Sequence, residues 1–325
     1  MTQRTLIVTD NGPETIDTAP EHAGEGDTLI EVSHSSVNYK DAMALDGNRA
    51  VLRTLPTVPG IDAVGRVVSS PSLPEGTLVT VNGFGIGEHR HGGYTPQLRI
   101  DASRITRVPS RFDAPTAAAI GTAGYTAALS VAALERALYP LDTLEAAERG
   151  PVLVTGATGG VGSIAVQLLS DRGFTVHALT GRVAEHGDWL RSLGASEVVD
   201  RAELSEPGKP LQKARYGAVV DALGGVPLAN AVSQVTWGGV VTACGRAAGV
   251  DLPASVVPFI LRGVQLIGVN SVDTPVALRK VAWDLLAESL DVDKLSVRTV
   301  SVEGAIDVGR ELLAGTGHGR TVVEI

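Results

Sequence analysis

The sequence has a single cysteine, Cys244, among its 325 residues. An internal disulfide needs two cysteines and a thiolate zinc site needs several, so both are excluded. Cys244 lies in the run VVTACG, where we expect the end of a strand. We therefore interpret its side chain as a buried, unreactive thiol.

Long apolar runs and an excess of positive charge are also missing. No stretch reaches the uninterrupted apolar length of a membrane span, and the N-terminal run MTQRTLIVTD lacks the apolar core and cleavage site of a signal peptide. The formal net charge is −9, from 36 acidic and 27 basic residues. We expect a cytoplasmic protein with no membrane or nucleic-acid partner, in which any recognition of an anion is local.

The chain does contain a glycine-rich turn directly after an apolar run. Residues 152–155 predict a buried parallel strand, and the following run Ala157-Thr158-Gly159-Gly160-Val161-Gly162 matches the dinucleotide fingerprint G-x-G-x-x-G with alanine first. Such a turn alone also occurs as plain structure. Here a helix with apolar residues at 164–169 and a second strand at 174–179 follow, and this β-α-β order favours a dinucleotide site.

The end of the second predicted strand indicates which cofactor binds. NAD sites carry an Asp or Glu there for the ribose hydroxyls, whereas this chain has Thr180-Gly181-Arg182. A hydroxyl and a guanidinium suit a 2′-phosphate, so we predict NADPH. The alternative is that Arg182 is an ordinary solvated arginine.

The pattern of elements predicts an α/β protein with two domains. Residues 1–113 contain short strands and many turn signals, and an alanine-rich helix at 117–137, with a break between Gly121 and Gly124, leads into six predicted parallel strands. The tail from Asp291 has short strands around one helix at 305–313.

Three segments resemble the medium-chain dehydrogenase/reductase superfamily: SSVNYKDAMALDG at 35–47, PGIDAVG at 59–65 and GTAGYTAAL at 121–129. VPFILR at 257–262 resembles the zinc-free acrylyl-CoA reductase family, formerly grouped with the quinone oxidoreductases. The resemblance implies a GroES-like, mostly β catalytic domain formed by residues 1–116 and 271–325. It further implies a Rossmann doubly wound parallel-sheet domain for NADPH at 117–270.

The resemblance also implies an activity, the NADPH-dependent reduction of a short 2-enoyl-CoA such as acryloyl-CoA. The cofactor contacts that it implies are Tyr39, Thr158, Gly159, Gly160, Val161, Thr180, Gly181, Arg182, Arg201, Gly245, Ile260 and Ser271. Arg201 is also expected from its place after a strand at 198–200, which brings a second cation beside Arg182.

Tyr39 is the candidate catalytic residue, with Asn38 and Asp41 beside it. A phenol can donate a hydrogen bond to an enolate or supply its proton, and the alternative is a ring that only packs against the nicotinamide. Lys40 and Asp41 are either charges of the substrate pocket or an ordinary solvated pair, and for Lys40 we favour the solvated pair. No metal is expected, because Ile61 stands where zinc members place a histidine ligand.

Two further expectations concern the substrate pocket and the assembly. The family usually has Gly-Glu-x-His-Trp-Gly-Gly where residues 87–93 read GEHRHGG, so the pocket is expected to differ. The apolar run at 256–270, which contains a strand predicted at 266–269, is too apolar for a solvent-facing edge strand and is predicted to pair with its copy in a homodimer. An NADPH:quinone oxidoreductase and a non-catalytic NADPH-binding sensor or structural protein remain alternative functions.

Overall fold

The computed structural model describes residues 3–138 and 150–325, which fall into two compact units. The first unit contains the chain up to Tyr125 together with Ser271–Ala287 and Leu295–Ile325, and the second contains Thr126–Asn270 and Glu288–Lys294. The first change of unit falls inside helix α2 (Ala114–Leu138) rather than at its start, because this one helix continues from one unit into the next. The assignment of catalysis to the first unit and NADPH to the second remains a prediction.

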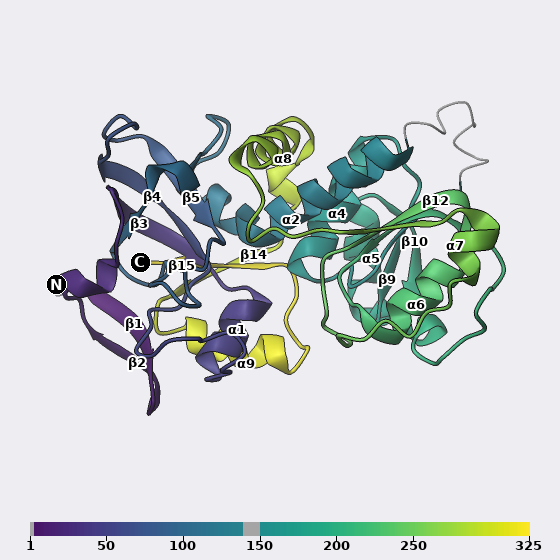
Figure 1. Cartoon of the computed structure of the whole chain (residues 1–325), viewed down its shortest axis with the longest axis horizontal. Coiled ribbons are helices and arrows are strands. Elements are labelled where there is room, and N and C mark those ends of the chain that lie inside the picture. Colours follow the sequence, from purple (N-terminus) through teal and green to yellow (C-terminus); the bar gives the residue numbers. More distant parts are fainter. Residues whose placement is uncertain (1–2, 139–149) are drawn as a thin grey trace. The chain divides into compact units, whose positions relative to one another are not determined.

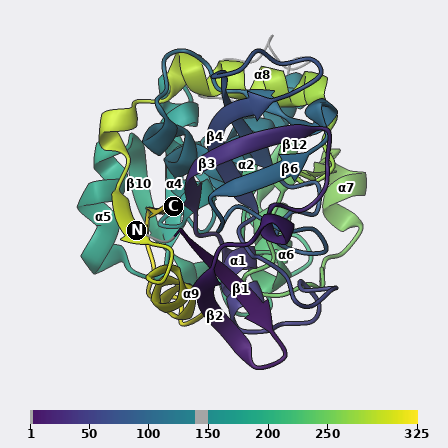
Figure 2. The same cartoon turned by 90° about the vertical axis from the view of Figure 1, so that its left-hand side faces the viewer.

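The first unit is built on a seven-stranded sheet in the order β14-β15-β3-β4-β5-β7, with β6 also pairing with β3. Figure 2 shows β3, β4 and β6 side by side. A separate hairpin, β1–β2, lies outside this sheet. The strands are β1 (Arg4–Thr9), β2 (Gly12–Asp17), β3 (Thr28–Ser36), β4 (Asp62–Ser69), β5 (Leu78–Asn82), β6 (Gln97–Ile100), β7 (Thr106–Arg107), β14 (Val297–Ser301) and β15 (Arg320–Glu324).

The tail of the chain completes this sheet. β15 pairs antiparallel with β3 and parallel with β14, so the last strand lies between the tail's own strand and one of the first strands of the chain. Three helices accompany the sheet: α1 (Tyr39–Leu45), α8 (Val276–Ser289) and α9 (Ala305–Leu313). α1 and α9 pack together in one apolar core, to which they contribute Ala44, Leu45 and Val308. This packing fixes α1, which carries the predicted catalytic residues.

The second unit contains a six-stranded parallel sheet in the order β10-β9-β8-β11-β12-β13. This is the strand order of the doubly wound dinucleotide-binding fold, as predicted. Its strands are β8 (Val152–Val154), β9 (Val176–Thr180), β10 (Ala195–Asp200), β11 (Tyr216–Asp221), β12 (Val235–Ala243) and β13 (Gln265–Gly268). Its helices include α4 (Gly160–Asp171), α5 (Val183–Ser192), α6 (Gly225–Ser233) and α7 (Val257–Arg262) (Figure 1). Leu153, Leu179 and Val241 from its central strands are buried in its core.

The apolar run at 256–270 is an edge strand only in its last part, where β13 matches the strand predicted at 266–269. Residues 257–262 form α7, and only Gln265–Gly268 form the edge strand β13. Pro258 suits the first turn of a helix because it has no N–H to donate, and Gly263, at φ 60°, ends the helix in the left-handed conformation. The exposed apolar side chains therefore lie on a short helix beside the sheet edge.

Helix α2 corrects a second expectation, that no stretch reaches the length of a membrane span. By length and composition alone α2 is long and apolar enough to cross a membrane, but 83% of its most apolar window is buried inside the protein, as in the core helix of a soluble protein. Gly121 interrupts it at φ 47° and ψ −158°, at the predicted break.

Candidate active site and cofactor cradle

The glycine-rich turn and helix α4 form the candidate phosphate cradle in the second unit. Gly159 precedes the helix, and no side chain caps its N-terminus. A Cβ on Gly162 would lie 2.3 Å from the Gly156 carbonyl oxygen, so only glycine lets α4 pack this closely on the turn. The first-turn N–H groups of a helix lack partners within the helix and favour an anion.

Two hydroxyls and two guanidinium groups gather at the end of β9. The Thr158 and Thr180 hydroxyl oxygens lie 3.5 Å apart, and an Arg182 Nη2 donates to Thr158 Oγ1 at 3.5 Å. The Arg201 guanidinium lies against Gly181, where an added Cβ would be 3.0 Å from its Nη2. The predicted residues at the ends of β9 and β10 thus come together in one group that suits a phosphate.

Asp221, Cys244 and Gly245 lie where the neighbouring strands β11 and β12 end. The Asp221 carboxylate accepts hydrogen bonds from the Thr155 hydroxyl at 2.7 Å and from the Gly224 N–H at 2.8 Å, and burial raises its pKa. Gly245 lies so close to Ala222 that an added Cβ would be 2.0 Å from its carbonyl oxygen. Burial raises the pKa of the Cys244 thiol to about 12, which fits the interpretation of an unreactive side chain.

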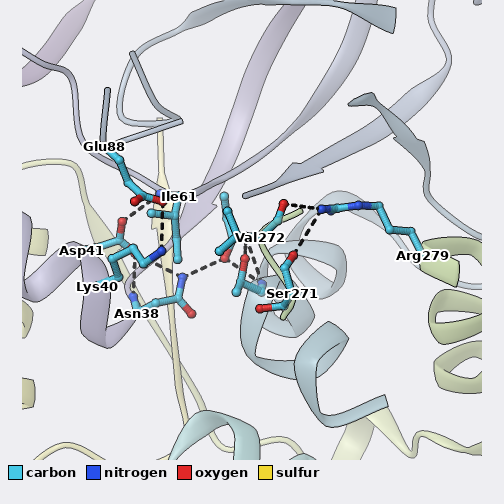
Figure 3. Close-up of polar contacts among 10 residues, drawn as sticks. Asn38, Lys40, Asp41, Ile61, Glu88, Ser271, Val272 and Arg279 are labelled. Atoms are coloured by element: carbon cyan, nitrogen blue, oxygen red, sulfur yellow. Dashed lines mark hydrogen bonds and ion pairs between the residues drawn. The ribbon is translucent and has the colours of Figure 1, made fainter. Parts of the chain in front are cut away.

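Asp41, in the first unit, is a buried support for the start of α1. Its side chain is fully buried, and its two oxygens accept hydrogen bonds from the backbone N–H groups of Asn38 and Ile61, each at 2.8 Å (Figure 3). Burial and the nearby Asp62 raise the pKa of Asp41 to about 7. Asp41 is therefore placed to position its neighbours rather than to touch a ligand.

The interpretation of Lys40 and Asp41 as a solvated pair was wrong. Figure 3 shows Lys40 directed to Glu88, and its Nζ donates to Glu88 Oε1 at 2.9 Å. The two side chains point in different directions because they follow one another on a helix, where neighbours do not face each other. This ion pair joins the start of α1 to the turn at 85–90.

Asp62 is a central acceptor that the sequence analysis did not identify. Its carboxylate accepts hydrogen bonds from Ser36 Oγ at 2.6 Å, Asn38 Nδ2 at 2.8 Å, Asn82 Nδ2 at 2.6 Å and Thr122 Oγ1 at 2.6 Å. These donors come from three separate segments of the chain, namely the junction of β3 and α1, the end of β5, and α2. Its position beside Ile61 in the PGID motif was the available signal.

Arg320 supplies positive charge to this buried group and was also missed. Its Nε donates to the Ala119 carbonyl at 2.6 Å and its Nη1 to Asn38 Oδ1 at 3.3 Å. It is 4% exposed, and its Nη2 is buried without a hydrogen-bond partner among the described residues. A lone arginine at the start of a C-terminal strand gives no sequence signal, because its partners lie far away along the chain.

Arg279 holds the segment that contains the predicted cofactor residue Ser271. Its Nη1 donates to the Asn82 carbonyl at 2.6 Å, and its Nη2 donates to the carbonyls of Ser271 and Val272 at 3.2 and 2.8 Å (Figure 3). The guanidinium also lies 3.9 Å from the centre of the Phe84 ring. This side chain is fully buried and fixes the backbone at 271–272.

The remaining predicted site residues lie in different units. Tyr39 is in the first turn of α1, 44% exposed, and its hydroxyl has no hydrogen-bond partner among the described residues. Ile260 is on α7 in the second unit and is 73% exposed. Whether Tyr39, Ser271 and Ile260 meet one cofactor stays a prediction.

No group of three or more His, Cys, Asp or Glu side chains that could hold a metal occurs in residues 3–138 and 150–325. Ile61 stands where the zinc members of the resembling superfamily place a histidine ligand. It is buried, and its N–H donates a hydrogen bond to Asp41. His91 uses Nδ1 to accept a hydrogen bond from the Val58 N–H at 3.0 Å.

Comparison with known proteins connects this geometry to a family. The family model described as alcohol dehydrogenase GroES-like domain matches residues 24–130, and the one described as zinc-binding dehydrogenase matches residues 160–288. The acrylyl-CoA reductase AcuI of Ruegeria pomeroyi is 41% identical over 306 residues, covering 92% of this chain and 90% of that protein.

Solved structures agree over the whole chain. The YhdH oxidoreductase of Salmonella enterica in complex with NADP has a TM-score of 0.93 and 37% identity, with 100% of both chains covered. The Bacillus subtilis protein YhfP with NAD bound has a TM-score of 0.91 and 36% identity, over 100% of this chain and 99% of that one. The chain therefore belongs to the medium-chain dehydrogenase/reductase superfamily and, within it, to the acrylyl-CoA reductase family of oxidoreductases.

Proposed function

We propose that this protein reduces the activated C=C bond of a short 2-enoyl-CoA, such as acryloyl-CoA, with NADPH. The observation that carries the proposal is the group of Thr158, Thr180, Arg182 and Arg201 at the ends of β9 and β10, in a chain 41% identical to an acrylyl-CoA reductase. This group suits a 2′-phosphate, and the turn at 158–161 suits the pyrophosphate.

The chemistry assigns a role to each unit. When bound, NADPH would supply a hydride for the β-carbon of the enoyl thioester, and the thioester oxygen would then take up the electron pair of the C=C bond. Tyr39, whose hydroxyl is available, donates a hydrogen bond to that oxygen or gives the proton that completes the α-carbon. Asn38 and Asp41 hold the first turn of α1, and Asp62 holds Asn38 in turn. We assign them positioning roles.

The proposed reaction needs no metal. Ile61 has no atom that can bind zinc, and Tyr39 provides the electrophilic assistance that a metal would otherwise give. Zinc analysis of untagged protein is the direct measurement. Stoichiometric zinc that is lost together with activity would contradict a metal-free reaction.

A screen of acceptors tests the proposed function. With NADPH oxidation as the readout, acryloyl-CoA, crotonyl-CoA and a simple quinone are compared at equal enzyme concentration. We expect the highest kcat/KM with acryloyl-CoA, because a short acyl group places the alkene with the fewest steric demands. A higher kcat/KM with the quinone would favour the quinone oxidoreductase alternative, and tight NADPH binding without any turnover would favour the sensor.

We also propose that the protein acts in the cytoplasm as a homodimer formed by its second unit. Five large apolar side chains on β12, on α7 and in the segment between them are at least 63% exposed, namely Trp237, Val250, Val256, Ile260 and Leu261. Burying such a patch is favourable, and β13 offers an unpaired edge beside it. Pairing of two β13 edges about a twofold axis would cover both patches.

A further inference from the structure

Arg49 and Arg53 lie on the loop that follows α1, and Arg90 ends the turn at 85–90. We refer to these three residues as the arginine cluster. The loop at 46–56 directly follows α1, and the Arg53 N–H donates to the Glu88 carbonyl at 3.0 Å. The Glu88 side chain in turn accepts from Lys40 on α1. These contacts hold the loop, the turn at 85–90 and the start of α1 together.

The arginine cluster is not neutralised by the protein. None of its three members takes part in an ion pair among the described residues, although Lys40 beside them is paired with Glu88. Arg49 and Arg53 are exposed. Arg90 is half-buried, and its Nε is fully buried without a hydrogen-bond partner. Because this Nε is closed to solvent, a ligand meets Arg90 only through its terminal guanidinium nitrogens.

The charge of the whole chain makes this local excess of cations significant. A net charge of −9 repels a polyanion such as coenzyme A, which carries a pyrophosphate and a 3′-phosphate. A substrate of this kind needs a local group of cations, and arginine suits phosphate oxygens best. On the loop at 46–56, Asp46 is the carboxylate that opposes the cluster, while the side chain of Asp41, in the first turn of α1, is buried.

We propose that the arginine cluster binds the phosphate groups of the coenzyme A part of the acceptor. This inference rests on the proposed function, because the cluster adjoins Lys40, the residue next to Tyr39. The long pantetheine arm of a coenzyme A thioester connects its acyl group to its phosphates. An acyl group at Tyr39 therefore leaves the phosphates able to reach the cluster.

The test compares two thioesters that differ only in the phosphate-bearing end. Acryloyl-CoA and acryloyl-pantetheine are reduced by the wild type, by Arg53→Glu and by the double variant Arg49→Glu/Arg53→Glu, all at exposed positions. Arg99→Glu, an exposed arginine on β6 without an ion pair, is the matched control. Because half-buried Arg90 is sensitive to misfolding, it is changed only to Lys, which keeps the charge and removes Nε.

We expect Arg53→Glu to raise KM for acryloyl-CoA roughly ten- to a hundredfold, with kcat little changed, since a charge-assisted contact is lost. Turnover of acryloyl-pantetheine should change less than twofold, and Arg99→Glu should behave as the wild type. Raising the salt concentration should increase KM for acryloyl-CoA in the wild type more than in the double variant.

Equal losses with both thioesters, or no loss with acryloyl-CoA, would overturn the assignment. So would a loss seen only with an acryloyl group carried on an acidic carrier protein, which would make that protein the occupant. If the wild type reduces neither thioester, the proposed function fails, and calorimetric binding of coenzyme A to wild type and variants still tests the cluster. Equal affinity of wild type and double variant would then reject it.

Discussion

At the scale of single residues, we expect Arg182 to determine how tightly the 2′-phosphate of NADPH is bound. Removing one charge-assisted contact costs about 1.5–3 kcal/mol, so Arg182→Ala should weaken NADPH binding roughly ten- to a hundredfold and leave NADH binding nearly unchanged. Cofactor titrations followed by fluorescence measure both. Arg191→Ala is the control. Arg191 lies in the last turn of α5, the helix that begins directly after Arg182, and it forms an ion pair with Asp188. Equal affinity of the wild type for both cofactors would contradict the assignment.

Tyr39 tests the mechanism rather than the cofactor. If its hydroxyl assists the reaction, Tyr39→Phe should lower kcat and kcat/KM together about a hundredfold, which corresponds to about 2.7 kcal/mol. NADPH affinity should stay almost intact because the ring remains. Near-full activity of Tyr39→Phe with an enoyl-CoA would leave the ring only a packing role, and Tyr39→Ala would then mainly weaken cofactor binding.

At the scale of elements, the break in α2 is part of the buried polar group. Gly121 has φ 47°, and an added Cβ would lie 2.6 Å from Asp62 Oδ2. Gly121→Ala should therefore lower the thermal midpoint by several degrees, a loss of about 1–3 kcal/mol, and reduce activity by shifting Asp62. Gly187→Ala is the opposite control, because Gly187 lies inside α5 with only the end of Arg191 nearby. It should be neutral or slightly stabilising, as is usual for helix interiors.

Local patterns predicted the second unit well. The glycine-rich turn, the six parallel strands and the grouping of Arg182 with Arg201 all follow from short-range signals, since parallel strands end at the same edge of a sheet. α7 was not predicted as a helix, because a short apolar run has no clear periodicity. Pro258 near its start and Gly263 at its end are the helix signals in this run.

The polar group of the first unit could not be predicted in the same way. Asp62, Asn82, Thr122 and Arg320 come from four segments, and only the folded sheet brings them together. No spacing rule connects a residue near the C-terminus to one near residue 62. The burial of Asp41 could not be predicted for the same reason. Its carboxylate accepts a hydrogen bond from the N–H of Ile61, which lies in a different segment of the chain.

At the scale of the whole molecule, the homodimer is the testable assembly. In a twofold interface the same substitution occurs on both protomers. Leu261→Asp on α7 would therefore place two carboxylates in the apolar contact and should weaken association about a hundredfold or more. Light scattering at micromolar concentration measures this. Leu278→Asp on α8, another exposed leucine, should leave the assembly unchanged. A wild type that is monomeric under these conditions would refute the dimer.

The place of β15 has a consequence for the order in which the chain can fold during synthesis. β3 is made early, yet it borders β15, which leaves the ribosome only after all the other strands and helices described above have been made. The parallel sheet of the second unit is complete by residue 268 and has no such delay. Domains generally fold as units as they emerge. The parallel sheet of the second unit can therefore form first, whereas Asn38, the neighbour of Tyr39, lacks its partner Arg320 until β15 has been made. A ribosome-bound nascent chain stopped before β15 would contain the candidate cofactor cradle but not the complete candidate catalytic site.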